Sequence, residues 1–479
     1  MRLIRSQTKV VATVGPASSS REVLTKMIHE GVDVIRVNFS HSSQAEFLRI
    51  KDLVDELNEE LKVNVSVLAD LQGPKIRVGE IQGDKLELIE DEIITLVNTQ
   101  SLVSREAVFV NYLPLPREVN PGEIILIDDG KIKLEVMDTN QTDSIRVKVI
   151  SGGILSSKKG VNLPDTRISL PCMTDIDISN AVFALEQDVD WLALSFVRKA
   201  SDIRELRSLV QSHHSHAGII AKIEKPEALE QIDEIIELSD GIMVARGDLG
   251  VEVSFDQVPL IQKEIVQKCI LQSKPVIIAT QMMESMITNF RPTRAEATDV
   301  ANAVLDSADA LMLSGETSMG KYPAETIQAM QRIIDYTEFK GKPYNKQHEP
   351  EQGTPTFMAD SICYNATRMA QQVNAQAIIT FTHSGYTAFR ISSHRPEADI
   401  FAFTNNEKLL RKLSLVWGAR AFYLESFKNI DDAVAKSIKI LLDKQLIKAG
   451  DTVIHVGSTP HDQHGRTNMM KISQIIPNH

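Results

Sequence analysis

The chain has 479 residues, enough for about three domains if each takes roughly 150 residues. Hydrophobic residues make up 43% and charged residues 24% of the sequence, a balance that excludes wholesale disorder and predicts a full hydrophobic core. The net charge of −12 argues against nucleic acid and anionic membranes as main partners, although a small anionic ligand needs only a local basic pocket.

Several short apolar runs, most of them followed by an amphipathic segment, occur along the chain as far as Lys340. Continuous apolar character, rather than alternation, is typical of strands buried on both faces. The runs are Lys9–Gly15, Val32–Phe39, Val65–Asp70, Trp191–Phe196, Ile219–Glu224, Ile242–Asp248, Val276–Thr280 and Ala310–Glu316. Helices are expected between them, among them Pro226–Leu238 and one that begins at Thr293 with Glu296 completing a capping box. Eight strand–helix units predict an α/β fold, a (β/α)₈ TIM barrel formed by residues 1–72 and 171–340.

This alternation of apolar runs and amphipathic segments is interrupted at two places, in residues 73–170 and in the segment after Lys340. Residues 73–170 contain alternating strand-like runs and turn signals such as Asp129-Gly130, which predict an inserted β-barrel-like lid domain. Its predicted strands are Lys85–Ile89, Ile124–Ile127, Ile132–Val136 and Ser144–Ile150. A proline-broken linker is expected at 341–355, followed by a separate α/β domain at 356–479. The strands predicted there are Ala377–Phe381, Asp399–Phe403, Ala421–Leu424 and Thr452–Val456, with a long helix at Asp431–Gln445.

Polar residues stand where the predicted barrel strands end, which is where such barrels carry their active sites. They are Arg36, Asn38, Ser40, Asp70, Lys222, Glu224, Arg246, Gly247, Asp248, Thr280, Ser314 and Glu316. Carboxylates beside Lys and Arg suit Mg²⁺ or Mn²⁺ with an anionic substrate. Because the set contains neither Cys nor His, a zinc or redox-metal site is not expected.

Each of these residues also has an ordinary structural interpretation. A single Lys or Glu at a strand end is more often a solvated surface group, and Asp248 can serve as a helix cap. However, Lys222 and Glu224 are two residues apart on one strand, so both side chains face the same side. Two opposite charges inside a barrel are costly without a ligand or metal, and this favours a functional site.

Several motifs, in order along the chain, resemble those of the pyruvate kinase family. They include Arg36-Val-Asn-Phe-Ser-His41, Lys158-Lys-Gly-Val-Asn-Leu-Pro164, Ala221-Lys-Ile-Glu224, Ala279-Thr-Gln-Met-Met-Glu-Ser-Met286 and Met312-Leu-Ser-Gly-Glu316. The resemblance implies transfer of the phosphoryl group of phosphoenolpyruvate to ADP, giving pyruvate and ATP, the last step of glycolysis. It also implies a barrel A domain, a B domain that closes over the site, a regulatory C domain and a homotetramer. A Mg²⁺-dependent, enolate-handling aldolase or lyase and a metabolite sensor are the alternatives.

The resemblance also implies residue roles. Glu224 and Asp248 would hold Mg²⁺, while a second divalent ion accompanies the nucleotide. Lys222 would stabilise the migrating phosphoryl group and Arg36 would pair with the substrate phosphate. The backbone of Gly247 and Asp248 would hold the substrate carboxylate. Thr280 would lie where the enolate is protonated, with Ser314 and Glu316 relaying the proton. The residues expected to bind the ADP phosphates are Asn38, His41, Arg77 and Lys159.

Lys75 distinguishes the chain from potassium-requiring members of the family. Their K⁺ is held by residues equivalent to Asn38, Ser40, Asp70 and the carbonyl of Leu71. Here Lys75 replaces a glutamate in Leu71-Gln-Gly-Pro-Lys-Ile-Arg-Val78, as in the potassium-independent branch. An ammonium group can occupy the volume and supply the charge of K⁺, so K⁺ is not expected to be required. The alternative is an exposed lysine at the domain hinge.

The sequence also leads to expectations about an effector loop and about the cellular location of the protein. Thr382, Ser384 and Thr387 form a loop suited to a phosphate, and the family's comparable loop implies activation by a sugar phosphate or AMP. A plain helix cap at Ser384 is the alternative, and the sequence departs from the common pattern at His461-Asp-Gln-His464. Three scattered cysteines indicate a reducing compartment, and no apolar run is long enough for a membrane span or signal peptide. A cytoplasmic protein is expected.

Overall fold

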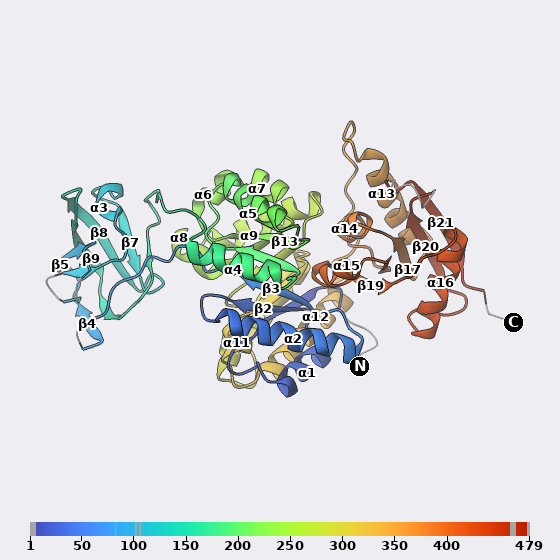
Figure 1. The fold of residues 1–479 in the computed structure, drawn as a ribbon, viewed down its shortest axis with the longest axis horizontal. Helices are drawn as coiled ribbons and strands as arrows, with labels where there is room; N and C mark the ends of the chain where they lie inside the picture. The colour runs from blue at the N-terminus through green and yellow to red at the C-terminus, as the bar shows by residue number, and fades with distance from the viewer. Residues whose placement is uncertain (1–5, 82, 101–102, 105–106, 460–465, 477–479) are drawn as a thin grey trace.

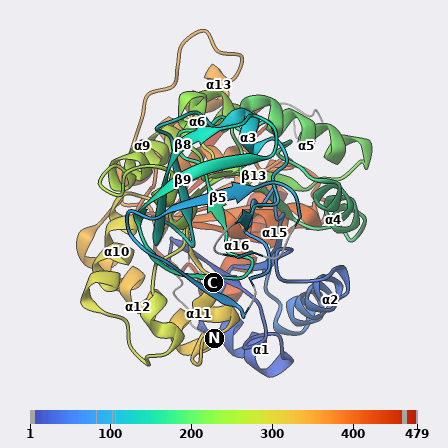
Figure 2. The same cartoon turned by 90° about the vertical axis from the view of Figure 1, so that its left-hand side faces the viewer.

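A computed structural model describes residues 6–81, 83–100, 103–104, 107–459 and 466–476. The chain forms three bodies in a row, with the β-rich insertion at one end, the barrel in the middle and the C-terminal α/β body at the other end (Figure 1). The turned view shows the insertion lying across one end of the barrel, within the ring of barrel helices (Figure 2). The C-terminal body covers the opposite end. None of the helices within the described ranges is long and apolar enough to span a membrane.

Eight parallel strands close into a barrel, which confirms the predicted fold class. In chain order they are β1 (Lys9–Thr13), β2 (Val34–Asn38), β3 (Ser66–Asp70), β12 (Trp191–Leu194), β13 (Gly218–Ile223), β14 (Gly241–Ala245), β15 (Val276–Ala279) and β16 (Ala310–Leu313). The helices around them are α1 (Arg21–Glu30), α2 (Gln44–Leu61), α4 (Asp175–Glu186), α5 (Ala200–Ser212), α6 (Pro226–Glu230), α7 (Ile232–Leu238), α8 (Arg246–Glu252), α9 (Val258–Leu271), α10 (Arg294–Leu305), α11 (Gly315–Ser318) and α12 (Pro323–Gly341). Closure comes from β1 pairing with β16, with Lys9 opposite Ala310.

Local details confirm some predictions and correct others. The capping box of Thr293 and Glu296 is present at the start of α10. The predicted helix Pro226–Leu238 is wrong as a single element, because it breaks at Gln231 into α6 and α7. The Gln231 side chain there accepts a hydrogen bond from the backbone N–H of Ala200. Several strands also end before the predicted runs do, and β14 stops at Ala245 because the next residues turn into α8.

The insertion packs two sheets around one core. A six-stranded sheet has the order β11-β7-β8-β9-β5-β6, and a two-stranded sheet pairs β10 with β4. Their bounds are β4 (Lys85–Leu88), β5 (Ile93–Val97), β6 (Val108–Phe109), β7 (Ile124–Ile127), β8 (Ile132–Thr139), β9 (Ser144–Ser151), β10 (Gly153–Ser156) and β11 (Val161–Asn162), with the short helix α3 (Leu115–Glu118). Leu88 and Leu155 of the small sheet share a hydrophobic core with the large one, so the insertion is a single packed unit.

The C-terminal body is a five-stranded sheet of order β19-β18-β17-β20-β21 covered by helices. Its strands are β17 (Ala377–Phe381), β18 (Asp399–Thr404), β19 (Ala419–Tyr423), β20 (Thr452–Gly457) and β21 (Met469–Gln474), and its helices are α13 (Phe357–Gln372), α14 (Tyr386–Ser393), α15 (Glu407–Lys412) and α16 (Ile430–Asp443). All pairings are parallel except that of the edge strand β21, which the sequence did not predict.

Four aspartates line the amino ends of the barrel strands, the end that we call the barrel floor. One precedes every second strand: Asp33, Asp190, Asp240 and Asp309. Each accepts a hydrogen bond of 2.8–3.1 Å from a backbone N–H at the start of the neighbouring strand. Each also faces one cation, in the same order Lys9 at 3.9 Å, Arg411 at 2.8 Å, Arg207 at 2.8 Å and Arg395 at 2.7 Å. Because Arg395 and Arg411 belong to the C-terminal body, two of these pairs fasten that body to the floor.

Candidate active site

Buried polar side chains gather at the other end of the barrel, the mouth that faces the insertion (Figure 2). Five of them, each no more than 8% exposed, form what we call the mouth cluster: Arg36, Asp70, Ser195, Lys222 and Glu224. They lie in or directly after β2, β3, β12 and β13, because parallel strands bring their carboxyl ends to one edge of a barrel.

Lys222 is the centre of the mouth cluster. Its ammonium nitrogen lies 2.7 Å from the Ser195 hydroxyl, 2.9 Å from a Glu224 carboxylate oxygen and 3.3 Å from an Asp70 oxygen. Burial alone would lower the pKa of Lys222, but the charges of Asp70 and Glu224 outweigh it and the pKa is raised. The lysine is therefore a permanent cation inside the mouth.

Asp70 joins Lys222 to Arg36. One Asp70 oxygen accepts the Arg36 Nε at 2.7 Å, and the guanidinium also donates to Thr13 Oγ1 at 2.8 Å. Burial would raise the pKa of Asp70, but Lys222 and Arg36 more than compensate and hold it below its usual value. This carboxylate is ionised and fixes the two cations side by side.

The two carboxylates expected to bind Mg²⁺ are held differently. Glu224 is 1% exposed, and its second oxygen accepts the backbone N–H of Phe196 at 2.8 Å. Asp248 is half-buried on the first turn of α8, and no hydrogen bond from a described residue holds its carboxylate. Burial and then the Glu224 charge raise the pKa of Asp248 to about 6. Among the described residues, the Glu224–Asp248 pair therefore lacks a cation bound to the Asp248 carboxylate.

Thr280 and Gly247 face each other across the mouth. The Thr280 hydroxyl accepts the Gly247 N–H at 2.7 Å, and the Thr280 carbonyl accepts from Arg246 at 2.8 Å. Thr280 has φ 68°, a backbone conformation that a β-branched residue rarely adopts and that costs about 1–3 kcal/mol. Such strain persists only where the surroundings impose it, as the bonds from Gly247 and Arg246 do here.

Glu316 and Ser314 lie beside this segment. The Glu316 carboxylate accepts two backbone N–H groups, from Met283 at 3.1 Å and from Ser314 at 2.7 Å, so it holds two loops together. The Ser314 hydroxyl is buried and has no hydrogen-bond partner among the described residues.

Lys75 contacts one of the residues expected to bind a monovalent cation. Its ammonium donates to Ser40 Oγ at 3.0 Å, and the Ser40 backbone N–H donates to Asn38 Oδ1 at 2.9 Å. Burial, followed by the charges of Lys222 and Arg77, lowers the pKa of Lys75. The lysine is half-buried, so the alternative of an exposed hinge lysine does not describe it.

The residues expected to bind a nucleotide fall into two groups. His41 lies near the mouth, where burial and the charges of Lys75, Arg36 and Arg77 lower its pKa. Lys159 lies instead in the insertion, where it pairs with Asp128 at 2.8 Å. The insertion touches the barrel at α8, because Asn162 donates to Glu252 at 2.7 Å. Between them, beside Asp248 and Asp129, lies a cavity of about 670 Å³.

The predicted effector loop lies in the C-terminal body, away from the mouth (Figure 1). Thr382 Oγ1 accepts the Gly385 N–H at 2.9 Å, and Thr387 Oγ1 lies 2.7 Å from Thr467 Oγ1. Gly385, with φ 89°, is the N-cap of α14, and Ser384 Oγ accepts the backbone N–H of Tyr386, the first residue of the helix, at 3.4 Å, so the alternative of a helix-capping Ser384 stays open. The unusual segment His461–His464 lies outside the described residues.

Ser195 and Phe196 are the functional residues that sequence reasoning missed. They end the predicted fourth strand, Trp191–Phe196, in the same position as the polar residues chosen after the other strands. Their place in the chain was therefore a usable signal. Neither residue type indicates chemistry by itself.

Comparisons with known proteins complete the description. A family model described as "Pyruvate kinase, barrel domain" matches residues 5–327, and "Pyruvate kinase, alpha/beta domain" matches residues 360–473. The chain is 41% identical to a pyruvate kinase of Sporosarcina psychrophila over 478 residues, covering 98% of this chain and 80% of that protein. It is also 41% identical to that of Agrobacterium vitis over 480 residues, covering 98% and 97%. A crystal structure of a pyruvate kinase from Cryptosporidium parvum matches with a TM-score of 0.91 and 33% identity, covering 98% and 96%.

Proposed function

The chain belongs to the pyruvate kinase family and is a phosphotransferase, and we propose that its mouth cluster transfers the phosphoryl group of phosphoenolpyruvate to ADP. The observation that carries this proposal is the fixed cation Lys222 between Asp70 and Glu224. Phosphoryl transfer depends mainly on positioning and on neutralising charge, and this arrangement supplies both. The cytoplasm, where glycolysis operates, is the proposed location.

Lys222 and Arg36 are the proposed phosphoryl-binding cations. Lys222 faces the mouth and stabilises the equatorial oxygens of the migrating group. Arg36 pairs with the substrate phosphate through a guanidinium that Asp70 and Thr13 already orient. Because Asp70 holds both cations, neither has to reorganise during the reaction.

Glu224 and Asp248 fit a divalent cation, Mg²⁺ or Mn²⁺. Among the described residues no group of three or more His, Cys, Asp or Glu side chains is arranged to hold a metal. Mg²⁺ commonly binds one or two carboxylates and completes its coordination with substrate oxygens and water, so two carboxylates suffice. The raised pKa of Asp248 beside Glu224 indicates a place for positive charge. When bound, the ion supplies charge that neutralises substrate oxygens.

The remaining mouth residues bind the rest of the substrates. The Gly247 and Asp248 backbone is proposed to hold the substrate carboxylate, at the first turn of α8. Thr280 delivers a proton to the enolate, and Ser314 with Glu316 supports that step. Because the Thr280 hydroxyl donates its proton to the Ala279 carbonyl at 2.6 Å, it has to turn from that acceptor toward the substrate to deliver the proton. The residues proposed for the ADP phosphates are Asn38, His41, Arg77 and Lys159, the last brought in by the insertion.

Lys75 is proposed to replace the monovalent cation that potassium-requiring relatives hold at Asn38, Ser40, Asp70 and Leu71. The bond from Lys75 to Ser40 supports this, because it puts an ammonium group on one of the expected cation ligands. K⁺ is therefore not required, although Mg²⁺ is.

Allosteric activation by a phosphorylated metabolite, a sugar phosphate or AMP, is proposed at Thr382, Ser384 and Thr387. The left-handed turn at Gly385 before α14 supports it. A variant with all three residues changed to Ala is expected to lose the activation that titration with sugar phosphates or AMP gives the wild type. Unchanged activation would contradict the placement.

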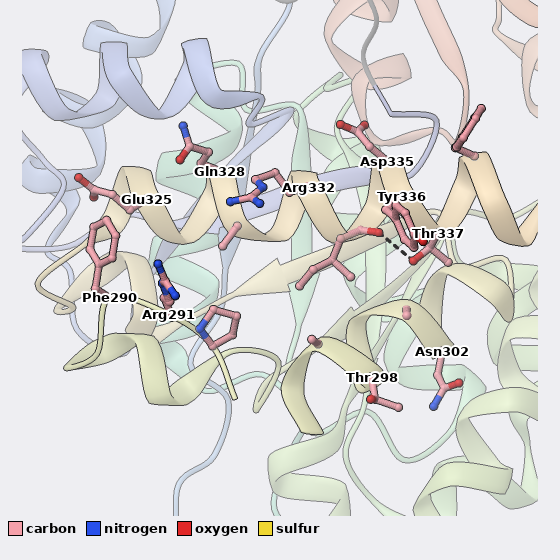
Figure 3. A pocket seen from close by; sticks show the side chains of 16 residues that line it. Phe290, Arg291, Thr298, Asn302, Glu325, Gln328, Arg332, Asp335, Tyr336 and Thr337 are labelled. Carbon is pink, nitrogen blue, oxygen red and sulfur yellow. Dashed lines mark hydrogen bonds between the residues drawn. The ribbon is translucent and has the colours of Figure 1, made fainter. Parts of the chain in front are cut away.

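A homotetramer is also proposed, and a groove between α10 and α12 supports it. The groove measures about 1180 Å³, and Phe290, Tyr336 and Phe339 on its rim are each more than half exposed. Figure 3 shows Glu325 and Arg332 on α12 and Arg291 on the facing turn, so a second copy related by a two-fold axis would meet opposite charges. The double variant Tyr336→Asp with Phe339→Asp is expected to shift the mass measured by light scattering toward a smaller assembly.

A coupled assay tests the reaction itself. The purified chain with phosphoenolpyruvate, ADP and Mg²⁺ should produce pyruvate, measured through lactate dehydrogenase and NADH. Omission of ADP is the control, since an aldolase or lyase has no need of a nucleotide. No pyruvate, or pyruvate formed without ADP, would contradict the proposed function.

A further inference from the structure

The Ser195 hydroxyl connects Lys222 to the backbone of the neighbouring strand end. Ser195 Oγ lies 2.7 Å from Lys222 Nζ and 2.6 Å from the Leu71 carbonyl oxygen, and the residue is 2% exposed. An ammonium group only donates and a carbonyl only accepts. Ser195 therefore accepts from Lys222 and donates to Leu71, which fixes its rotamer and one direction of the ammonium group.

The next residue holds the carboxylate partner of Lys222. Phe196 has φ 55° and uses its backbone N–H to bind Glu224 at 2.8 Å. Glu224 in turn accepts from Lys222 at 2.9 Å. One turn after β12 thus fixes Lys222 of β13 and Glu224 directly after that strand. The left-handed backbone of the turn is a strained conformation that close surroundings must maintain.

Those surroundings include the start of the insertion. Gly73 has φ 71°, and a Cβ there would lie 2.6 Å from the Phe196 ring and 3.0 Å from the Ser195 Cβ. The Gly73 N–H is held by Asp177 Oδ1 at 3.0 Å. The chain that leads to the lid therefore packs directly on the Ser195–Phe196 turn.

We propose that Ser195 is a positioning residue for the phosphoryl transfer, which sets the Lys222 ammonium through its hydroxyl. The inference rests on the role proposed above for Lys222. It differs from a packing role, because the hydroxyl binds the one cation at the centre of the mouth cluster. A displacement of about 1 Å at such a group costs up to about 10²-fold in rate.

Ser195→Ala, Ser195→Cys and the control Ser66→Ala test this proposal. Ser66 in β3 is equally buried, but its hydroxyl has no hydrogen-bond partner among the described residues. Ser195→Ala is expected to lower kcat by about 10- to 100-fold with the KM for phosphoenolpyruvate within about threefold, since positioning acts mainly in the transition state. Ser195→Cys keeps the bulk with a weaker hydrogen-bond partner and should fall between Ala and wild type.

The outcomes separate this inference from the proposed function. If wild type and Ser66→Ala do not form pyruvate from phosphoenolpyruvate and ADP, the proposed function fails. If they do, a kcat within twofold of wild type in both Ser195 variants overturns the positioning role. A raised KM at unchanged kcat, or an equal loss of kcat in Ser66→Ala, overturns it as well. Should Ser195→Ala not fold by circular dichroism, the Cys variant decides by the same criteria.

Discussion

The mouth and the floor of the barrel are built from similar charges but use them differently. At the floor, each of the four aspartates accepts a backbone N–H from the neighbouring strand and faces a cation, and Asp309 accepts a second backbone N–H, from Trp417 at 3.1 Å. At the mouth, Lys222 is shared among three acceptors and Asp248 has no fixed partner. Left-handed residues occur at both ends, at Phe196, Thr280 and Gln281 of the mouth and at Asp188, Ser307 and Arg395 of the floor.

The difference in bonding between the mouth and the floor indicates which buried charges belong to an active site. A carboxylate with one donor and one cation is satisfied and contributes to stability. A cluster with shared donors and a carboxylate that no hydrogen bond from a described residue holds has room for another charged group, which is what a substrate or metal supplies. Buried charge by itself therefore does not identify an active site.

The largest expected effect comes from Lys222→Met, which removes the shared cation of the mouth. Its kcat should fall by about 10³-fold or more with little change in KM for phosphoenolpyruvate, because the charge acts on the transferring group. Steady-state kinetics on protein shown to be folded by circular dichroism measure it. Near-normal turnover of the variant would contradict the proposed difference between the mouth, which carries out the reaction, and the floor, which stabilises the fold.

Arg395→Met makes the opposite test at the floor. It leaves the buried Asp309 carboxylate without its cation and should lower the free energy of unfolding by about 3–5 kcal/mol, with kcat unchanged in the folded fraction. Lys342→Met is the control, because its pair with Glu397 at 3.6 Å is exposed and worth about 0–1 kcal/mol. Urea unfolding measures the loss of unfolding free energy in both variants. Equal losses in Arg395→Met and Lys342→Met would show that burial of the ion pair does not increase its contribution to stability.

His394, where the C-terminal body meets the linker, gives a second test of whether groups near the floor contribute to the stability of the fold. The centroid of its ring lies 4.2 Å from that of His348, with the two rings tilted by 35°. Burial, then the charges of His348, Arg390 and Arg395, lower the pKa of His394 from 6.5 to about 3. Between these values the unfolded chain binds more protons, so stability falls as pH falls, by about 2 kcal/mol from pH 7 to pH 5.

Urea unfolding of wild type and His394→Phe at both pH values measures this dependence. The variant should lose most of it, whereas His29→Phe, at an exposed histidine of α1, should keep it. An equal slope in all three proteins would assign the pH dependence to other groups.

The smallest effect concerns Lys75 at the mouth. The kcat of the wild type should be near its maximum in sodium- and potassium-free buffer. The kcat of Lys75→Glu should be about tenfold lower there, which corresponds to about 1.4 kcal/mol of activation free energy, and should recover when KCl is added. Strong activation of the wild type by KCl would contradict the replacement, and so would a Lys75→Glu enzyme that is active and indifferent to KCl.

The strands were predictable because both of their faces are buried, and Val276–Thr280 or Ala310–Glu316 read as apolar runs. Their ends were not, since the predicted run Ile242–Asp248 included the polar residues at which the backbone already turns into α8. Lys222 and Glu224 were predicted from their spacing and the barrel. Ser195 was not, because its role depends on a rotamer and on Lys222, which is 27 residues away. The edge strand β21 was missed because none of its residues is buried, so its apolar pattern is weak.

The place of the insertion also sets the order in which the barrel can be completed during synthesis. At about 5–20 residues per second, the roughly 120 residues between β3 and β12 take about 6–24 s to emerge. The sheet pairings of the insertion lie within Lys85–Asn162, so it can finish folding in that interval. The first three barrel strands meanwhile expose two unpaired edges, and β1 must wait for β16, about 300 residues later. A nascent chain of this protein therefore carries an open sheet of three barrel strands that needs protection from other chains.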